Sequence, residues 1–165
     1  MIQLGRSVVA DAGPLIAFGR IGKLHLLTQV LGEVLVPQAV ISECLADPEK
    51  PGARAIRDGI KARLLVKTSD PAIALPPLPV LDAGESAAIR RALDLSALIL
   101  IDEKAGRKIA ASLGLSVIGS AGVLLVAKKN GLIDLVKPML DEFAGNGYHF
   151  SAALIAAILM RAGER

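Results

Sequence analysis

Uninterrupted apolar runs of strand length alternate along this chain with segments of helical periodicity. The runs Val8–Ala10, Val34–Val36 and Ala97–Ile101 contain no polar residue, and a segment of helical pattern follows each of them. A strand without a polar face must be covered on both sides, which is the usual condition of a parallel sheet in an α/β protein. The alternation therefore predicts an α/β fold with a central parallel sheet between helices.

The same pattern predicts the order of the remaining elements. Further strands are expected at 63–67 and 116–118. Helices are expected from Pro14 with a break near Gly19 and Gly22, from Pro37 to about Leu45, and over 53–60, 84–93, 104–113, 121–129, 132–144 and 151–162. The four prolines of 69–80 exclude regular structure there and indicate a surface connection. Since no repeat divides the 165 residues, we expect a single domain over 1–165, with the helices from about 132 packing on it.

Composition excludes several classes of protein. Aromatic residues make up 2% of the chain, so a base-stacking platform of the kind found in sheet-type RNA readers is not expected. The single cysteine, Cys44, excludes an internal disulfide and is typical of a reducing compartment. Apolar runs such as Ala152–Met160 fall short of the roughly 20 residues that a membrane span requires. We therefore expect a soluble cytoplasmic protein that does not bind membranes.

Two acidic residues stand at the ends of predicted strands. Asp11 follows Val8–Ala10, and Asp102 follows Ala97–Ile101. Ligands of open parallel sheets bind at the carboxyl ends of the strands, so both carboxylates are expected in one crevice. For either acid alone, its favourable interaction with the dipole of the helix that follows is the preferred explanation, whereas the two acids together favour a functional one. Together, two carboxylates repel unless a cation lies between them, and an oxygen-only site suits Mg²⁺ or Mn²⁺.

Other polar residues have a structural explanation as well as a functional one. Glu43 falls away from the apolar side of its predicted helix and so resembles an ordinary exposed acid. Asp82 and Glu85 have the spacing of a capping box, and Ser120 is placed to cap a helix from Ala121. From the segments that contain these residues, the structural explanation is favoured for each of them, although it does not exclude a functional one.

A family resemblance bears on this choice. The segments "VVADAGPLIAFGRIGKLHLL", "VPQAVISE", "LDAGESAAIRRALDL", "LILIDEKAGRKIAASLGLSVIGSAGVLLVAKKNGLI" and "LMRAGE" resemble PIN-domain proteins, in particular a branch similar to the VapC toxin ribonucleases. The resemblance covers nearly the whole chain and implies a three-layer α/β/α fold with an acidic pocket.

The resemblance also implies a set of site residues. The acids that match the family's metal ligands are Asp11, Glu43, Glu85 and Asp102. If the match shifts by one residue, Glu103 takes the place of Asp102. Ser120 matches a hydroxyl that lies beside the pocket. The chain departs from the family at Gly13, where many PIN domains have a serine or threonine that orients the first acid or a metal-bound water.

The implied function is that of a ribonuclease. Hydrolysis of RNA phosphodiester bonds with Mg²⁺ or Mn²⁺ is expected, with Lys104, Arg107 and Lys108 holding the RNA backbone. The resemblance further implies a homodimer and a small antitoxin protein as partner. Two other classes remain open. One is a PIN-like binding module with weak or no catalytic activity, which Gly13 favours, and the other is a phosphoryl-transfer protein of doubly wound fold. A hydrolase of the latter class requires a second aspartate at position 13, which the chain lacks.

Overall fold

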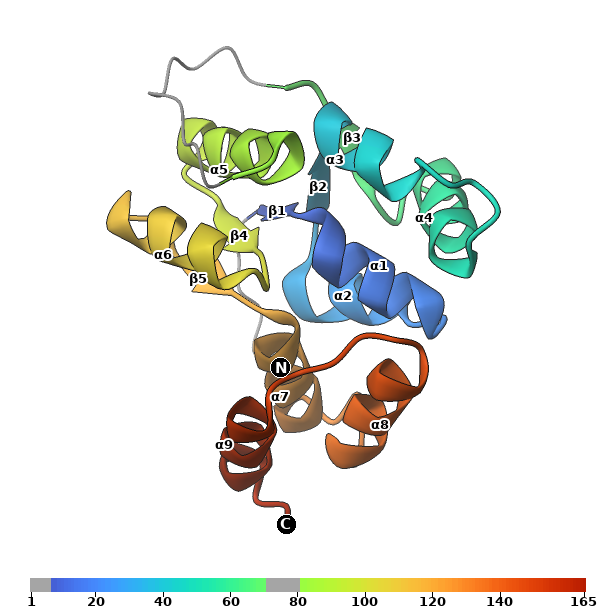
Figure 1. Cartoon of the computed structure of the whole chain (residues 1–165), viewed down its shortest axis with the longest axis vertical. Helices are drawn as coiled ribbons and strands as arrows, with labels where there is room; N and C mark the ends of the chain where they lie inside the picture. Colours follow the sequence, from blue (N-terminus) through green and yellow to red (C-terminus); the bar gives the residue numbers. More distant parts are fainter. Residues whose placement is uncertain (1–6, 71–80) are drawn as a thin grey trace.

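A parallel sheet forms the centre of the computed structural model, which describes residues 7–70 and 81–165 (Figure 1). Within these residues the sheet has five strands in the order β3-β2-β1-β4-β5, and every neighbouring pair is parallel. The strands are β1 (Val8–Ala10), β2 (Val34–Pro37), β3 (Val66–Thr68), β4 (Leu98–Leu100) and β5 (Val117–Ile118). The predicted parallel sheet is confirmed.

Helices cover both faces of the sheet and complete the three layers. In the described part of the chain they are α1 (Ala12–Arg20), α2 (Leu24–Leu31), α3 (Gln38–Cys44), α4 (Pro51–Lys61), α5 (Ala83–Leu95), α6 (Lys104–Ser112), α7 (Ser120–Lys129), α8 (Lys137–Gly145) and α9 (Ala152–Ala162). The α5 and α6 helices lie on the face opposite to α1 and α2, and α7 packs against α2 (Figure 1). The expected three-layer α/β/α fold is therefore observed. No helix within these ranges is both long and apolar enough to span a membrane.

Two neighbouring strands at the centre of the sheet determine where a ligand can bind. The β1 and β4 strands are buried on both faces and pair in register, with Ala10 beside Leu100. The chain leaves β1 toward β2 on one side and leaves β4 toward β5 on the other. The helices that follow these two strands therefore diverge, and a crevice opens at their carboxyl ends.

Some predicted boundaries are wrong, for local reasons. The strand expected at 63–67 begins at Val66, because Arg63 has a left-handed backbone conformation (φ 59°) that a strand does not accommodate. The helix expected from 132 begins at Lys137, since Pro138 is tolerated only in a first turn. The expected break near Gly22 is confirmed, and that glycine has φ 69°. Most of the proline-rich connection predicted at 69–80 lies outside the described residues.

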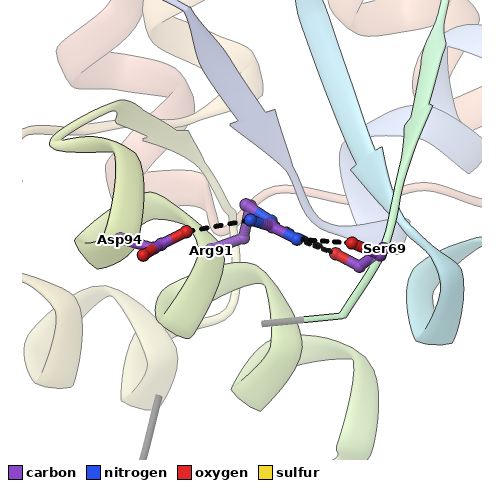
Figure 2. Close-up of polar contacts among 3 residues, drawn as sticks. All are labelled: Ser69, Arg91 and Asp94. Carbon is purple, nitrogen blue, oxygen red and sulfur yellow. Dashed lines mark hydrogen bonds and ion pairs between the residues drawn. The ribbon is translucent and has the colours of Figure 1, made fainter. Parts of the chain in front are cut away.

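Arg91 of α5 binds the residue that follows the edge strand β3 and so links this strand to the helical layer. Figure 2 shows its guanidinium reaching across to Ser69, where it donates to the carbonyl oxygen and, at 3.0 Å, to Oγ. The same guanidinium forms an ion pair of 2.9 Å with Asp94. The adjacent Asp70 accepts a hydrogen bond from the Ala39 N–H at the start of α3. Residues 69 and 70 therefore link α5 to α3.

A buried carboxylate near the C-terminus holds α9 in place. Glu164 accepts hydrogen bonds from Lys128 Nζ at 2.8 Å and from the N–H groups of Val136 and Lys137. Burial alone would raise the pKa of Glu164, but these donors outweigh it and lower the pKa to about 2. Glu164 is therefore ionised at neutral pH and ties the end of α9 to α7 and α8.

We expect Arg91→Ala to lower the free energy of unfolding by about 1–2 kcal/mol, because it removes the charged donors from Ser69 and leaves Asp94 unpaired. Urea unfolding measures the difference, with Arg57→Ala on the exposed side of α4 as the control. Equal stability of the two variants would contradict a structural role for Arg91.

Candidate active site: an acidic cleft at the sheet edge

A cleft of about 970 Å³ opens beyond the carboxyl ends of β1 and β4. Acidic residues line one part of it, whereas α7, α9 and the segment between α8 and α9 line the rest with mainly apolar side chains. The carboxylates come from four separate segments of the chain and are Asp11, Glu43, Asp82, Glu85, Asp102 and Glu103. The four acids expected from the resemblance thus lie in one cavity.

Asp11 is the most buried of these acids. Its backbone N–H donates to the Leu100 carbonyl at 2.9 Å, which continues the pairing of β1 and β4 by one residue. The residue is only 6% exposed, and its Oδ1 accepts no hydrogen bond from the described residues. The pKa of Asp11 is raised to about 7, chiefly by burial and further by the negative charges of nearby acids. A hydrogen bond with the backbone of Ala12 lowers the pKa in part. A buried carboxylate without a partner is costly, so this oxygen is available to a cation or a proton.

Asp102 is held by hydrogen-bond donors on both of its oxygens. Oδ1 accepts from the Ser120 N–H at 2.7 Å, and Oδ2 accepts from Ser120 Oγ at 2.5 Å. The Tyr148 hydroxyl also donates to Oδ2. Burial and the charge of Asp102 raise the pKa of the Tyr148 phenol well above its usual range, which keeps this hydroxyl protonated and able to donate. Asp102 therefore has a fixed orientation in the cleft.

Glu43 and Glu85 reach the cleft from α3 and α5. A Cβ on Gly84 would lie 2.5 Å from Oε2 of Glu43, so α5 approaches α3 closely only because position 84 has no side chain. A Cβ on Gly106 of α6 would lie 2.6 Å from Cδ1 of Ile101, whereas Glu85 Oε2, at 3.5 Å, would be in ordinary contact with it. The glycine at position 84 therefore makes room for Glu43, and the glycine at position 106 makes room for Ile101.

The surroundings of these glutamates favour their protonated forms. Burial, followed by the charge of Asp82, raises the pKa of Glu43. Burial, interaction with Asp82 and the charges of nearby acids raise the pKa of Glu85 to about 8. Glu85 Oε2 is also buried and accepts no hydrogen bond from the described part of the chain. Like Asp11, Glu85 therefore has an oxygen that lacks a partner.

Glu103 and three basic residues occupy the margin of the cleft. Glu103 is exposed and caps α6, accepting from the Ala105 N–H at 3.2 Å. Lys104 and Lys108 are exposed on α6 and line the cleft, one turn apart. Arg107 donates from Nη1 to the Ile101 carbonyl at 2.9 Å, so part of its guanidinium has a structural role. The two lysines are consequently freer than Arg107 to contact a ligand.

Sequence reasoning placed some of these residues incorrectly and missed others. The capping interaction of Asp82 with the Glu85 N–H is present at 2.7 Å, but Ser120 does not cap α7. It lies inside the helix, and its hydroxyl binds Asp102 instead. Asp82 was recognised only as a cap, although it also lines the cleft. Tyr148 was missed entirely, and its one signal was that it is the sole tyrosine of the chain.

A PIN-domain family model, DUF3368, matches residues 7–164. The chain belongs to the PIN-domain family. No curated protein matches it.

Two solved structures are similar in fold to this PIN domain. A PilT N-terminus domain protein from Sulfolobus solfataricus P2 is 18% identical with a TM-score of 0.48, and the match covers 88% of this chain and 97% of that one. A domain of a functionally unknown protein from Methanocaldococcus jannaschii DSM 2661 is 14% identical with a TM-score of 0.47, covering 70% and 91% respectively.

PIN domains are generally nucleases, and those nucleases commonly use divalent metals. Among residues 7–70 and 81–165, no group of three or more ligating side chains is already arranged around one cation position. The chemistry of the donors nevertheless fits a hard divalent cation, since they are carboxylates and two of their buried oxygens lack a partner. Asp11, Glu43, Glu85 and Asp102 are the residues that would hold such an ion in this PIN domain.

The raised pKa of Asp11 predicts how the stability of the metal-free protein depends on pH. Folding raises this pKa from 3.8 to about 7, so the folded protein binds the proton more tightly than the unfolded chain does. Stability should therefore fall as the pH rises from about 4 to about 7. In EDTA at pH 8, Asp11→Asn should be more stable than the wild type by roughly 4 kcal/mol, and this advantage should shrink at pH 4.

Chemical denaturation at the two pH values measures this difference. Asp58→Asn, on the exposed surface of α4, is the control and should show no such dependence. An Asp11→Asn variant less stable than the wild type at both pH values would show that Asp11 has a structural partner.

Proposed function

We propose that this PIN domain is a metal-dependent endoribonuclease that hydrolyses RNA phosphodiester bonds in the cytoplasm. The observation that carries the proposal is the convergence of Asp11, Glu43, Glu85 and Asp102 on one cleft, with partnerless buried oxygens on two of them. A structural explanation of these acids accounts for caps and exposed positions, but not for buried carboxylates without donors. A site for Mg²⁺ or Mn²⁺ would account both for the convergence of the four acids and for the buried oxygens without a partner.

The residues of the cleft have distinct parts in the proposed mechanism. Asp11, Glu43, Glu85 and Asp102 would be the metal ligands, with Glu103 at the margin, and Ser120 acts through Asp102 by fixing its orientation. The chemistry that a bound divalent ion supplies is activation of water and stabilisation of charge on the leaving 3′ oxygen. The acids form no covalent bond to RNA. Their negative charge requires the phosphates to be held from the rim, where Lys104 and Lys108 lie.

Cleavage of a labelled single-stranded RNA tests the proposal. We expect cleavage with Mn²⁺ or Mg²⁺, inhibition by EDTA, and a loss of at least about 100-fold in Asp11→Asn, because that variant removes a charged ligand from the site. Asp58→Asn is the control. Divalent-dependent cleavage that is unchanged in Asp11→Asn would disprove the site assignment.

The lysines of α6 generate a second prediction. Replacing both Lys104 and Lys108 with alanine should weaken RNA binding and reduce the slope of log affinity against log salt by about 1 for each lysine. Arg57 and Lys61, which are exposed on α4, form the matched pair of controls. Filter binding at several salt concentrations measures the slopes, and equal losses in both double variants would contradict a specific RNA path along α6.

A PIN-like binding module without catalytic activity is the second candidate function. Its supporting observation is that the acids of the described chain are not already arranged as a three-ligand metal group. Position 13 also provides no hydroxyl. RNA binding that persists in Asp11→Asn, together with no cleavage by the wild type under any divalent metal, would select this function.

We further propose that the ribonuclease is a VapC-like toxin that forms a homodimer and is paired with a small antitoxin protein. The C-terminal helix supports a protein partner, because α9 is predominantly apolar while Met160 and Leu154 are 78% and 43% exposed. A small antitoxin-like gene directly upstream is the observation that distinguishes a toxin from a housekeeping nuclease.

A further inference from the structure

Tyr148 brings a hydroxyl into the acidic cleft from a segment far along the chain. The residue lies between α8 and α9, and its backbone N–H donates to the Phe143 carbonyl at 2.9 Å. Its side-chain hydroxyl donates to Oδ2 of Asp102, an acid 46 residues earlier in the sequence. The contact therefore joins the C-terminal part of the fold directly to one of the cleft carboxylates.

The ring of Tyr148 belongs to a cluster that contains all the other aromatic residues of the chain. The sequence contains three phenylalanines, one tyrosine and no tryptophan. Tyr148 packs edge-on against Phe150 with centroids 5.5 Å apart, and lies 6.0 Å from Phe143. Phe143 in turn contacts Phe150 and, at 5.0 Å, Phe18 of α1. In a chain so poor in aromatics, this cluster gives the phenol a fixed direction.

The hydroxyl lies beside a position that has no side chain. A Cβ added to Gly13, in the first turn of α1, would lie 3.5 Å from the Tyr148 oxygen. Gly13 does not have a positive φ, so its backbone does not require glycine. Position 13 is two residues after Asp11, which places the Tyr148 oxygen between the segments that carry Asp11 and Asp102.

We propose that Tyr148 is a positioning residue of the metal site, whose hydroxyl takes the place of a side-chain hydroxyl at position 13 and locks Asp102 for cation binding. This inference rests on the proposed function. Asp102 already accepts two hydrogen bonds from Ser120, one on each oxygen. The donor from Tyr148 approaches Oδ2 from a different element and removes the remaining freedom of the carboxylate to tilt.

Binding of Mn²⁺ alone, followed by calorimetry, tests the proposal without RNA. Tyr148→Phe keeps the ring against Phe143 and Phe150 and removes only the oxygen. We expect the dissociation constant for Mn²⁺ to rise about 10-fold, since loss of a residue that orients a metal ligand typically weakens binding 10- to 100-fold. In RNA cleavage the same variant should recover toward the wild-type rate as Mn²⁺ is raised to saturation, a recovery that a purely structural defect would not show.

A second substitution distinguishes the hydroxyl from a packing effect. Gly13→Ser added to Tyr148→Phe returns a hydroxyl close to the vacated position, so Mn²⁺ affinity should return to within about 3-fold of wild type. Gly13→Ala in the same background adds the carbon without the oxygen and should not rescue. Thermal unfolding of each variant in EDTA verifies that all of them fold.

The outcomes separate this inference from the proposed function. Wild-type protein that binds no Mn²⁺ and cleaves no RNA overturns both. Wild-type protein that binds Mn²⁺ while Tyr148→Phe binds it equally well overturns only the role of Tyr148. Equal rescue by Gly13→Ser and Gly13→Ala also overturns it, since packing rather than the hydroxyl would then be responsible.

Discussion

The site depends on the parallel pairing of β1 with β4. Their register sets Ala10 beside Leu100, and the hydrogen bond from the Asp11 N–H to the Leu100 carbonyl carries the pairing past the end of β1. Asp11 and Asp102 are thereby fixed at the same sheet edge by backbone geometry rather than by their side chains. Because the chain leaves these strands in opposite directions, the helices beyond them diverge, and Glu43 and Glu85 enter the gap from the layers on either side.

This arrangement concentrates negative charge that the described residues do not neutralise. The guanidinium of Arg107 donates to a backbone carbonyl, whereas Lys104 and Lys108 are at the rim. Burial accordingly raises the pKa values of Asp11 and Glu85 to about 7 and 8. Titratable groups perturbed in this way are typical of functional sites, and the divalent cation proposed for this cleft would offset the cost of burying them as anions.

The sequence indicates some parts of this site and not others, for physical reasons. Asp11 and Asp102 follow apolar strands, and the sheet rule alone predicts that they are neighbours. Glu43 and Glu85 lie on helices whose local patterns are satisfied by exposure and capping, so only the family resemblance pointed to them. Ser120 was predicted to cap a helix because a hydroxyl before a helical segment usually does so. A partner 18 residues earlier, Asp102, takes its hydroxyl instead.

Tyr148 illustrates the general limit of reading a site from local sequence. Its segment contains no motif, and its place beside the acids depends on three contacts from separate parts of the fold: the aromatic cluster around Phe143, the open position at Gly13 and the carboxylate of Asp102. The Lys128–Glu164 pair, which anchors the end of α9 to α7, helps to hold the C-terminal part of the fold that carries the tyrosine. The acidic site is therefore not complete in the β1–β4 core alone. The strands bring the acids together, and the last helices determine how one of those acids is oriented.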